Sequence, residues 1–115
     1  MTAYGFMIPI LPGQEEPYRQ FLADLQGLRR AEYETTWQHL GMRTNRIWLQ
    51  PTPQGSVAIV YLEADDMDRV FTEIATSDAP FLGWWRAQVL AIHGVDFSQP
   101  LPAPPNEQLF DWSEA

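Results

Sequence analysis

Residues 47–66, IWLQPTPQGSVAIVYLEADD, predict two β-strands that fold back on one another. Two runs rich in Ile, Val, Leu and aromatic residues flank a short stretch that contains Pro and Gly, which is the pattern of a β-hairpin. We place a two-residue turn at Gln54-Gly55, because glycine accepts the positive φ that tight hairpin turns require. A longer loop that begins at Pro51 is the alternative.

This turn fixes which residues of the hairpin share a face. It predicts Trp48 opposite Tyr61 and Arg46 opposite Glu63, and successive side chains of a strand point to opposite sides. One face is then entirely aliphatic and consists of Ile47, Leu49, Ala58, Val60 and Leu62. The other is mixed and consists of Arg46, Trp48, Gln50, Ile59, Tyr61 and Glu63. We expect the aliphatic face to pack on helices.

The mixed face is expected to be covered by something other than helices. A Trp and a Tyr each bury up to roughly 150–250 Å² when they are covered, whereas a face open to water more often carries Lys, Thr, Glu and Ser. Because the helices are expected on the aliphatic side, the cover is a second copy of the protein, a ligand, or both.

The chain before the hairpin predicts a strand and then helical structure. Residues 4–11 form an apolar strand, in which Pro9 either causes a bulge or ends the pairing near Ile8. Apolar residues then recur at helical spacing from about residue 15 to Gly41, with a break near residues 27–30.

The chain after the hairpin predicts two helices and a last strand. Asp65 or Asp66 caps the first helix, and Asp78 caps the second, which ends at His93-Gly94. Residues 98–106, SQPLPAPPN, are too rich in proline for helix or sheet and should run extended over the surface. Residues 107–112, EQLFDW, predict a strand.

The order of these elements predicts an α+β protein of the ferredoxin-like split βαβ type. Its sheet is antiparallel, and one extra helix precedes the last strand. A chain of 115 residues is long enough for one core and too short for two, so residues 1–115 are expected to form a single domain.

Composition narrows the classes of partner. A net charge of -8 argues against binding the phosphate backbone of nucleic acids. The chain has no Cys, which excludes disulfides and thiolate sites. We find neither a signal-peptide pattern nor the roughly 18 apolar residues of a membrane span, so we expect a cytoplasmic protein without a membrane partner.

Seven short strings carry a resemblance that spans nearly the whole chain: RRAEYE, LGMR, WLQPTPQG, VYLEADD, SDAPF, WWR and HGVDF. In this order they resemble a family of small bacterial proteins within the dimeric α/β-barrel group. Its distant relatives include antibiotic-biosynthesis monooxygenases, stress-responsive barrel proteins and heme-degrading enzymes. The resemblance implies a homodimer whose two sheets face one another in a barrel, with a pocket between sheet and helices in each subunit. The WWR helix and the proline-rich segment are additions to the simplest members.

Candidate catalytic groups are few. His39 and His93 are the only histidines, and each is a weak candidate for proton transfer. Histidine beside a capping glycine, as at position 93, more often only stabilises the end of a helix. Neither lies in an HxH or HExxH motif, and EADDMD lacks the central Gly and later Glu of a calcium loop, so no metal is expected. The first strand lacks the Asn that heme-degrading relatives use, and we expect no cofactor.

Arginine and tryptophan supply the remaining candidates. The arginines at positions 29, 30, 43 and 46 either hold a carboxylate ligand or pair with Glu32, Glu34 and Glu63. Trp84 and Trp85 lie about 100° apart on a helix. One of them is therefore expected in the core, and the other in a pocket or a dimer contact.

These features favour a homodimeric small-molecule-binding protein. Its pocket would combine Arg46, Trp48, Tyr61 and Glu63 with residues near His39 and with Trp84 or Trp85. If it is an enzyme, cofactor-independent oxidation, as in a monooxygenase, or proton-transfer isomerisation of an aromatic or polyketide-like compound fits best. The alternative is a non-catalytic dimerisation or binding module with no active site.

Overall fold

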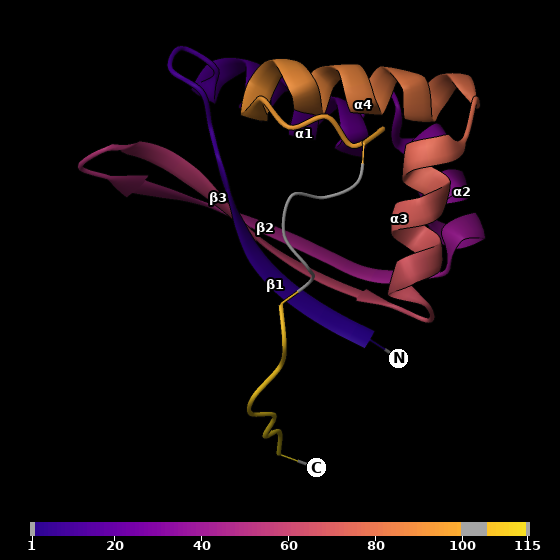
Figure 1. Cartoon of the computed structure of the whole chain (residues 1–115). Helices are drawn as coiled ribbons and strands as arrows, with labels where there is room; N and C mark the ends of the chain where they lie inside the picture. Colours follow the sequence, from indigo (N-terminus) through magenta and orange to yellow (C-terminus); the bar gives the residue numbers. More distant parts are fainter. Residues whose placement is uncertain (1, 100–105, 115) are drawn as a thin grey trace.

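The structure is a computed structural model that describes residues 2–99 and 106–114. In this part of the chain the elements are β1 (Thr2–Pro9), α1 (Glu15–Gln26), α2 (Arg30–Leu40), β2 (Met42–Thr52), β3 (Gly55–Ala64), α3 (Met67–Thr76) and α4 (Pro80–His93). The strands form an antiparallel sheet in the order β1-β3-β2. All four helices cover one side of this sheet (Figure 1). The architecture is α+β and is consistent with the predicted ferredoxin-like fold.

The predicted last strand at residues 107–112 is wrong for the single chain. Residues 106–114 contain no strand and lie on the side of the sheet that faces away from the helices (Figure 1). Large apolar and aromatic residues make a segment compatible with a strand, but they do not supply the edge to pair with. Within the described residues, β1 therefore keeps one edge without a partner strand.

The hairpin turn lies at Pro53-Gln54, so the prediction of Gln54-Gly55 is wrong by one residue. Thr52 pairs with Gly55, which takes a φ of 120° directly after the turn. The proline ring holds φ near -65°, which suits the first turn position, and the Thr52 hydroxyl accepts a hydrogen bond from the Gln54 N–H at 3.2 Å.

The register changes accordingly, whereas the two faces stay as predicted. Trp48 lies opposite Ile59 and Arg46 opposite Tyr61, instead of the predicted Tyr61 and Glu63. Moving the turn by one residue shifts each pair by two, and side chains alternate with a period of two. The aliphatic face therefore still points to the helices.

One end of the sheet departs from a regular ladder, whereas the end near Pro9 does not. A register shift between Met42 and Thr44 makes Arg43 an extra residue in β2. Pro9 does not end the pairing of β1 at Ile8, because it still pairs with Val57, and Ile10 donates to the Ser56 carbonyl at 3.1 Å.

The helix boundaries follow the sequence with one exception. Helix α1 ends at Gln26 and α2 begins at Arg30, as the break near residues 27–30 predicted, and Asp66 caps α3 by accepting from Arg69 N–H at 3.2 Å. Asp78 does not cap α4, because Ala79 occupies that position without a side-chain cap. Of the expected extended segment 98–106, residues 100–105 lie outside the described part.

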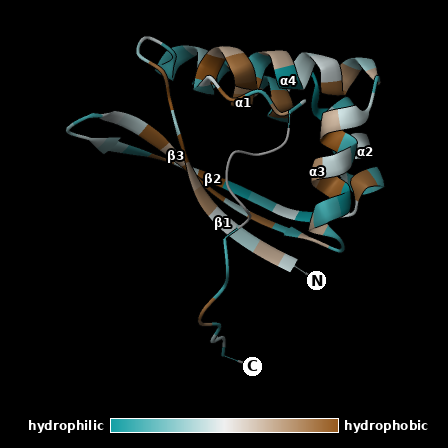
Figure 2. Ribbon diagram, in the orientation of Figure 1, coloured by the Kyte–Doolittle hydropathy of each residue, from teal (hydrophilic) through white to brown (hydrophobic). Residues whose placement is uncertain are grey.

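The core lies between the aliphatic face of the sheet and the helices. Hydrophobic residues gather on the facing sides of the two layers (Figure 2). Leu62 of β3, Val70 of α3 and Ile92 of α4 are at most 7% exposed. Within residues 2–99 and 106–114, no helix has the length and apolar character needed to cross a membrane.

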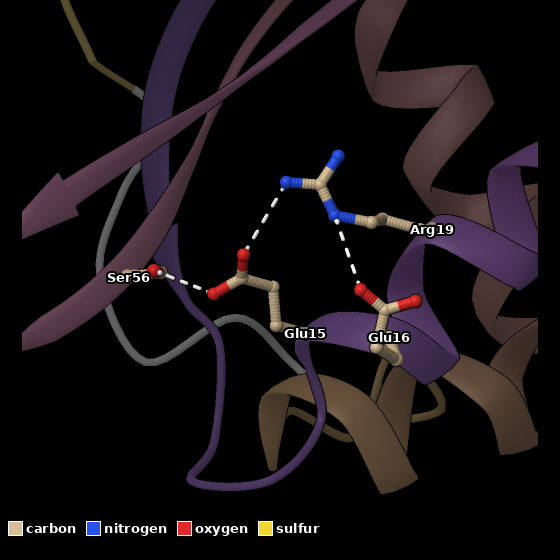
Figure 3. Close-up of polar contacts among 4 residues, drawn as sticks. All are labelled: Glu15, Glu16, Arg19 and Ser56. Atoms are coloured by element: carbon tan, nitrogen blue, oxygen red, sulfur yellow. Dashed lines mark hydrogen bonds and ion pairs between the residues drawn. The ribbon is translucent and has the colours of Figure 1, made fainter.

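A polar contact ties the hairpin to the first helix. The Ser56 hydroxyl donates to Glu15 at 3.1 Å, and Arg19 pairs with Glu15 at 3.3 Å and with Glu16 at 3.7 Å (Figure 3). These groups are half-buried or exposed, so the contact orients the strands more than it stabilises the fold.

Candidate functional site

The sheet separates the predicted site residues into two groups. His93, Trp84 and Trp85 belong to α4, on the helix side, and His39 is exposed in the last turn of α2. The other four, Arg46, Trp48, Tyr61 and Glu63, lie on the opposite face. The chain therefore has two candidate surfaces, which we call the inner cavity and the outer face, in place of the single expected pocket.

The inner cavity lies between the sheet and all four helices and has a volume of about 80 Å³. Its walls are mostly aliphatic and aromatic side chains. They include Phe6, Ile47 and Val60 from the sheet and Phe21, Phe71, Trp85 and Phe97 from the helices and the segment after α4. Trp85 contributes to this wall. Trp84 instead stacks beneath the Arg29 guanidinium at 4.0 Å.

His93 is buried at one end of the cavity and has a defined tautomer. Its Nδ1 lies 2.6 Å from the Pro9 carbonyl oxygen, which can only accept, so Nδ1 carries the hydrogen and Nε2 is the unprotonated nitrogen. Burial lowers the pKa of His93 below 6.5, although the Pro9 hydrogen bond opposes this shift. His93 is therefore a neutral imidazole at neutral pH, which is the state that a general base needs.

Tyr18 lies beside His93. The two rings meet edge to face with their centres 4.8 Å apart. Tyr18 is 3% exposed, and burial raises the pKa of its hydroxyl to about 12. Tyr18 therefore stays protonated at neutral pH, and its hydroxyl can donate a hydrogen bond.

Trp37 and Asn45 of the cavity wall, together with Tyr33 behind them, form what we call the polar corner. The Asn45 amide nitrogen donates to the Tyr33 hydroxyl at 3.0 Å, whereas its Oδ1 is buried without a partner. The Trp37 indole N–H is also buried; it lies near the same Tyr33 hydroxyl but outside full hydrogen-bonding geometry. Burial raises the pKa of Tyr33, and hydrogen bonding from Asn45 and Trp37 partly offsets this rise. Asn45 Oδ1 is thus left without a partner, and the Trp37 N–H is only weakly satisfied.

The strand alternation in the sequence indicates part of the polar corner, although the residue types alone do not. Position 45 has the same parity as Ile47 and Leu49, so alternation places Asn45 on the face that packs against the helices. A polar side chain on an otherwise aliphatic face points to a buried polar group. Tyr33 and Trp37 were visible only as part of a helical apolar pattern.

The outer face is apolar and lacks a covering layer in the described part of the chain. Met7 is 72% exposed and Trp48 53% exposed. An open groove of about 400 Å³ runs between them, which we call the outer groove. Its lining consists of Gly5, Phe6, Met7, Trp48, Ile59, Val60 and Tyr61.

Polar groups stand beside the outer groove. The Arg46 guanidinium lies 6.0 Å from the centre of the Tyr61 ring, and the described residues show no ion pair between Arg46 and Glu63. The shift of the hairpin register accounts for this, because it moves Arg46 from Glu63 to Tyr61. Partial desolvation and the neighbouring Glu63 raise the pKa of Tyr61.

The other arginines mostly pair with acids, which is the simpler of the two predicted roles. The pairs are Arg29–Glu32 at 3.2 Å, Arg30–Glu34 at 2.8 Å and Arg43–Asp65 at 2.7 Å. Within the described ranges, no group of three His, Asp or Glu side chains is placed to hold a metal ion.

Comparison with known proteins supports the fold. No family model matches the chain. No curated protein matches its sequence. The structure is similar to the crystal structure of an L-rhamnose mutarotase from Formosa agariphila, with a TM-score of 0.69, 14% sequence identity and coverage of 98% of this chain and 100% of that chain. This supports a ferredoxin-like fold, while the resemblance to antibiotic-biosynthesis monooxygenases remains a resemblance of sequence strings.

Proposed function

We propose that the protein is a homodimer that binds one small, mostly apolar molecule in the inner cavity of each subunit. The two copies face one another through their outer faces, as in a dimeric α/β barrel. Arg46, Trp48, Tyr61 and Glu63 then belong to the contact between copies, and Trp85 belongs to the ligand site.

The unpaired Asn45 Oδ1 and the weakly satisfied Trp37 N–H of the polar corner support the ligand site best. A buried polar group without a partner costs about 1–3 kcal/mol, so each such group in a folded protein calls for an explanation. One hydroxyl group can accept from the Trp37 N–H and donate to Asn45 Oδ1. A carbonyl or an ether oxygen satisfies only Trp37. The favoured ligand is therefore an alcohol or phenol with an otherwise apolar body.

The size of the cavity limits this ligand. At about 80 Å³ the cavity is smaller than the engineered cavity of roughly 150 Å³ that takes up benzene. The ligand is either no larger than a short-chain alcohol, or its binding displaces half-buried wall residues such as Phe71 and Trp85. An aromatic or polyketide-like compound requires the second case.

Proton-transfer isomerisation is the reaction that the cavity favours. The unprotonated nitrogen of His93 supplies a base and the Tyr18 hydroxyl supplies a hydrogen-bond donor, so a proton can move between two atoms of a ligand without a cofactor. The structural neighbour is named as a mutarotase, which is also an isomerase. The cavity favours this class over cofactor-independent oxidation, because an acid and a base are what it offers.

Binding of small alcohols and phenols tests the proposal. We expect the NMR signal of the Trp37 indole N–H to shift saturably with at least one such compound. Asn45→Leu should weaken that binding about tenfold or more, because a hydrogen bond in a buried site is lost. Gln50→Leu, an exposed change in the same strand, is the matched control and should bind as the parent does.

Solvent exchange then separates an enzyme from a binding module. In deuterated water, a proton-transfer enzyme should introduce deuterium at a carbon atom of the bound compound, because hydroxyl hydrogens exchange with water without catalysis. This exchange should be lost in His93→Gln and kept in His39→Gln, because His39 is exposed on α2. The absence of any compound that shifts Trp37 would contradict the proposal, whereas binding without exchange would leave a non-catalytic binding protein.

A further inference from the structure

Residues 106–114, the C-terminal segment, expose an unusual amount of apolar surface. Leu109 is 85% exposed, Phe110 83% and Trp112 74%. Single exposed apolar residues are common, but a run of large ones usually marks an interaction site. Phe110 and Trp112 would point to the same side if the segment became extended on contact with a partner. The segment therefore carries large apolar side chains that the single chain does not cover.

The C-terminal segment starts on the outer face and then leaves it. Asn106, Glu107 and Gln108 line a hollow of about 240 Å³ together with Ala3, Tyr4, Gly5 and Tyr61. From there the chain continues away from its own sheet, on the side opposite the helices (Figure 1). Asp111 still lies near enough to Tyr61 to raise its pKa, and Phe110 and Trp112 on either side of Asp111 are left uncovered by the same chain.

The outer groove is an apolar surface against which these aromatic residues can be buried. Met7 and Trp48 flank it, and Gly5 leaves room because it has no side chain. Next to it runs the edge of β1 that has no partner strand among the described residues. Arg46 is the basic side chain of this face, whereas Glu107, Asp111 and Glu114 make the segment acidic. The groove is apolar, like the aromatic side chains, and Arg46 adds one attractive charge to a face that also carries Glu63.

Distance favours a second copy as the source of the aromatic residues. Facing sheets pack about 10 Å apart, and an extended chain advances about 3.3 Å per residue. Residues 109–112 can therefore reach about 13 Å, which is enough to pass from the outer face of one copy to that of another. In a two-fold dimer the same contact forms twice.

We infer that the C-terminal segment of each copy packs Phe110 and Trp112 into the outer groove of the other copy, between Met7 and Trp48. This inference rests on the proposed homodimer and names the element that holds it together. Each copy then buries two aromatic side chains of the other. The largest apolar contacts lie near the centre of the interface, where residues contribute most to affinity.

Cysteine cross-linking tests which chain supplies the segment. The chain contains no Cys, so introduced thiols are the only ones present. A mixture of Met7→Cys and Phe110→Cys proteins should form a disulfide-linked heterodimer on oxidation. A protein that carries both changes, oxidised at high dilution, should not form a disulfide within one chain. Cross-linking within single chains, or none in the mixture, would overturn the inference.

Dimer dissociation provides the second measurement. We expect Phe110→Ala with Trp112→Ala to raise the dissociation constant at least about thirtyfold, in the range for interface hot spots. Leu28→Ala is the control, because Leu28 is 92% exposed in the turn between α1 and α2, and its dissociation constant should stay unchanged. The changed residues are exposed in the single chain, so folding should persist.

The results distinguish this inference from the proposed function. A dimer that persists unchanged in the double variant and forms no cross-link contradicts the C-terminal contact and leaves the homodimer standing. A full-length chain that is monomeric at every concentration contradicts both. The affinity for alcohols at Asn45 is measured independently of dimerisation. It should be the same in the Phe110→Ala, Trp112→Ala variant as in the parent.

Discussion

The burial of His93 makes the stability of the protein depend on pH. The pKa of His93 is lower in the folded state than its ordinary value of 6.5, so below pH 6.5 the unfolded chain takes up a proton more readily. The free energy of unfolding should fall as the pH drops below 6.5, with a slope of up to about 1.4 kcal/mol per pH unit, and level off below the folded pKa. Above pH 6.5 this group should have no effect.

Urea unfolding across this range measures the effect. Carboxylates also titrate in acid and change the stability, so the parent is compared with His93→Gln. This variant should lose the pH dependence of the free energy of unfolding nearest pH 6.5. His39→Gln should retain it, because His39 is exposed. An unchanged slope in His93→Gln would show that His93 is protonated as easily in the folded protein as in the unfolded one.

At the scale of single residues, the sequence predicted where side chains point better than what they contact. Alternation placed Trp48 and Tyr61 on one face correctly. It could not show that Arg46 lies against Tyr61 instead of Glu63, because that depends on a two-residue difference in register. It also could not show that His93 meets the Pro9 carbonyl, since the two residues are brought together only by the packing of α4 on the end of β1.

The end of helix α2 offers a test at the scale of an element. Gly41 has a φ of 79°, and a Cβ there would lie 3.3 Å from Asp65 Oδ2, which accepts from Arg43. Gly41→Ala should destabilise the protein by about 1–2 kcal/mol for the left-handed backbone and by a further amount for moving Asp65. Thermal or urea unfolding measures this loss.

Gly13 is the matched control for Gly41. Its φ is 80°, yet a Cβ there would meet nothing within 4 Å. Gly13→Ala should therefore cost only the backbone term. Equal losses at the two positions would show that the contact between Asp65 and Arg43 yields without cost, as many exposed ion pairs do.

At the scale of elements, helices were easier to predict than strand pairing. The apolar spacing of α1 to α4 and the glycines that end α2 and α4 are local signals, and they were correct. The hairpin turn was missed by one residue, because Pro53 and Thr52 favour a turn that Gly55 follows. Residues 107–112 have the composition of a strand, but a partner edge is a long-range property that local pattern does not contain.

The charge of the whole molecule gives a test of the proposed dimer. Each copy carries a net charge of -8, so two copies repel one another at long range. Salt shortens the Debye length from about 30 Å at 0.01 M to about 8 Å at 0.15 M. We therefore expect the dimer to tighten severalfold over this range, as measured by analytical ultracentrifugation. A dimer that weakens with salt would instead indicate an interface held by ion pairs.

For the whole molecule, the order of elements was enough to predict an α+β fold with helices on one side of an antiparallel sheet. The same order could not separate the inner cavity from the outer face, and the predicted pocket combined residues from both. Burial explains the difference: Trp85 and His93 are placed by α4, whereas Arg46 and Trp48 project from the other side of the sheet that α4 covers.

Pro9 at the end of β1 has a consequence for solubility. An open strand edge is a template on which further chains can add, and such growth leads to aggregates. Ile10 donates to β3, so by alternation Ala3, Gly5 and Met7 point their N–H groups to the open edge, where Pro9 has none to offer. The proline thus removes the last donor of this edge and shortens the ladder that an added chain could form there.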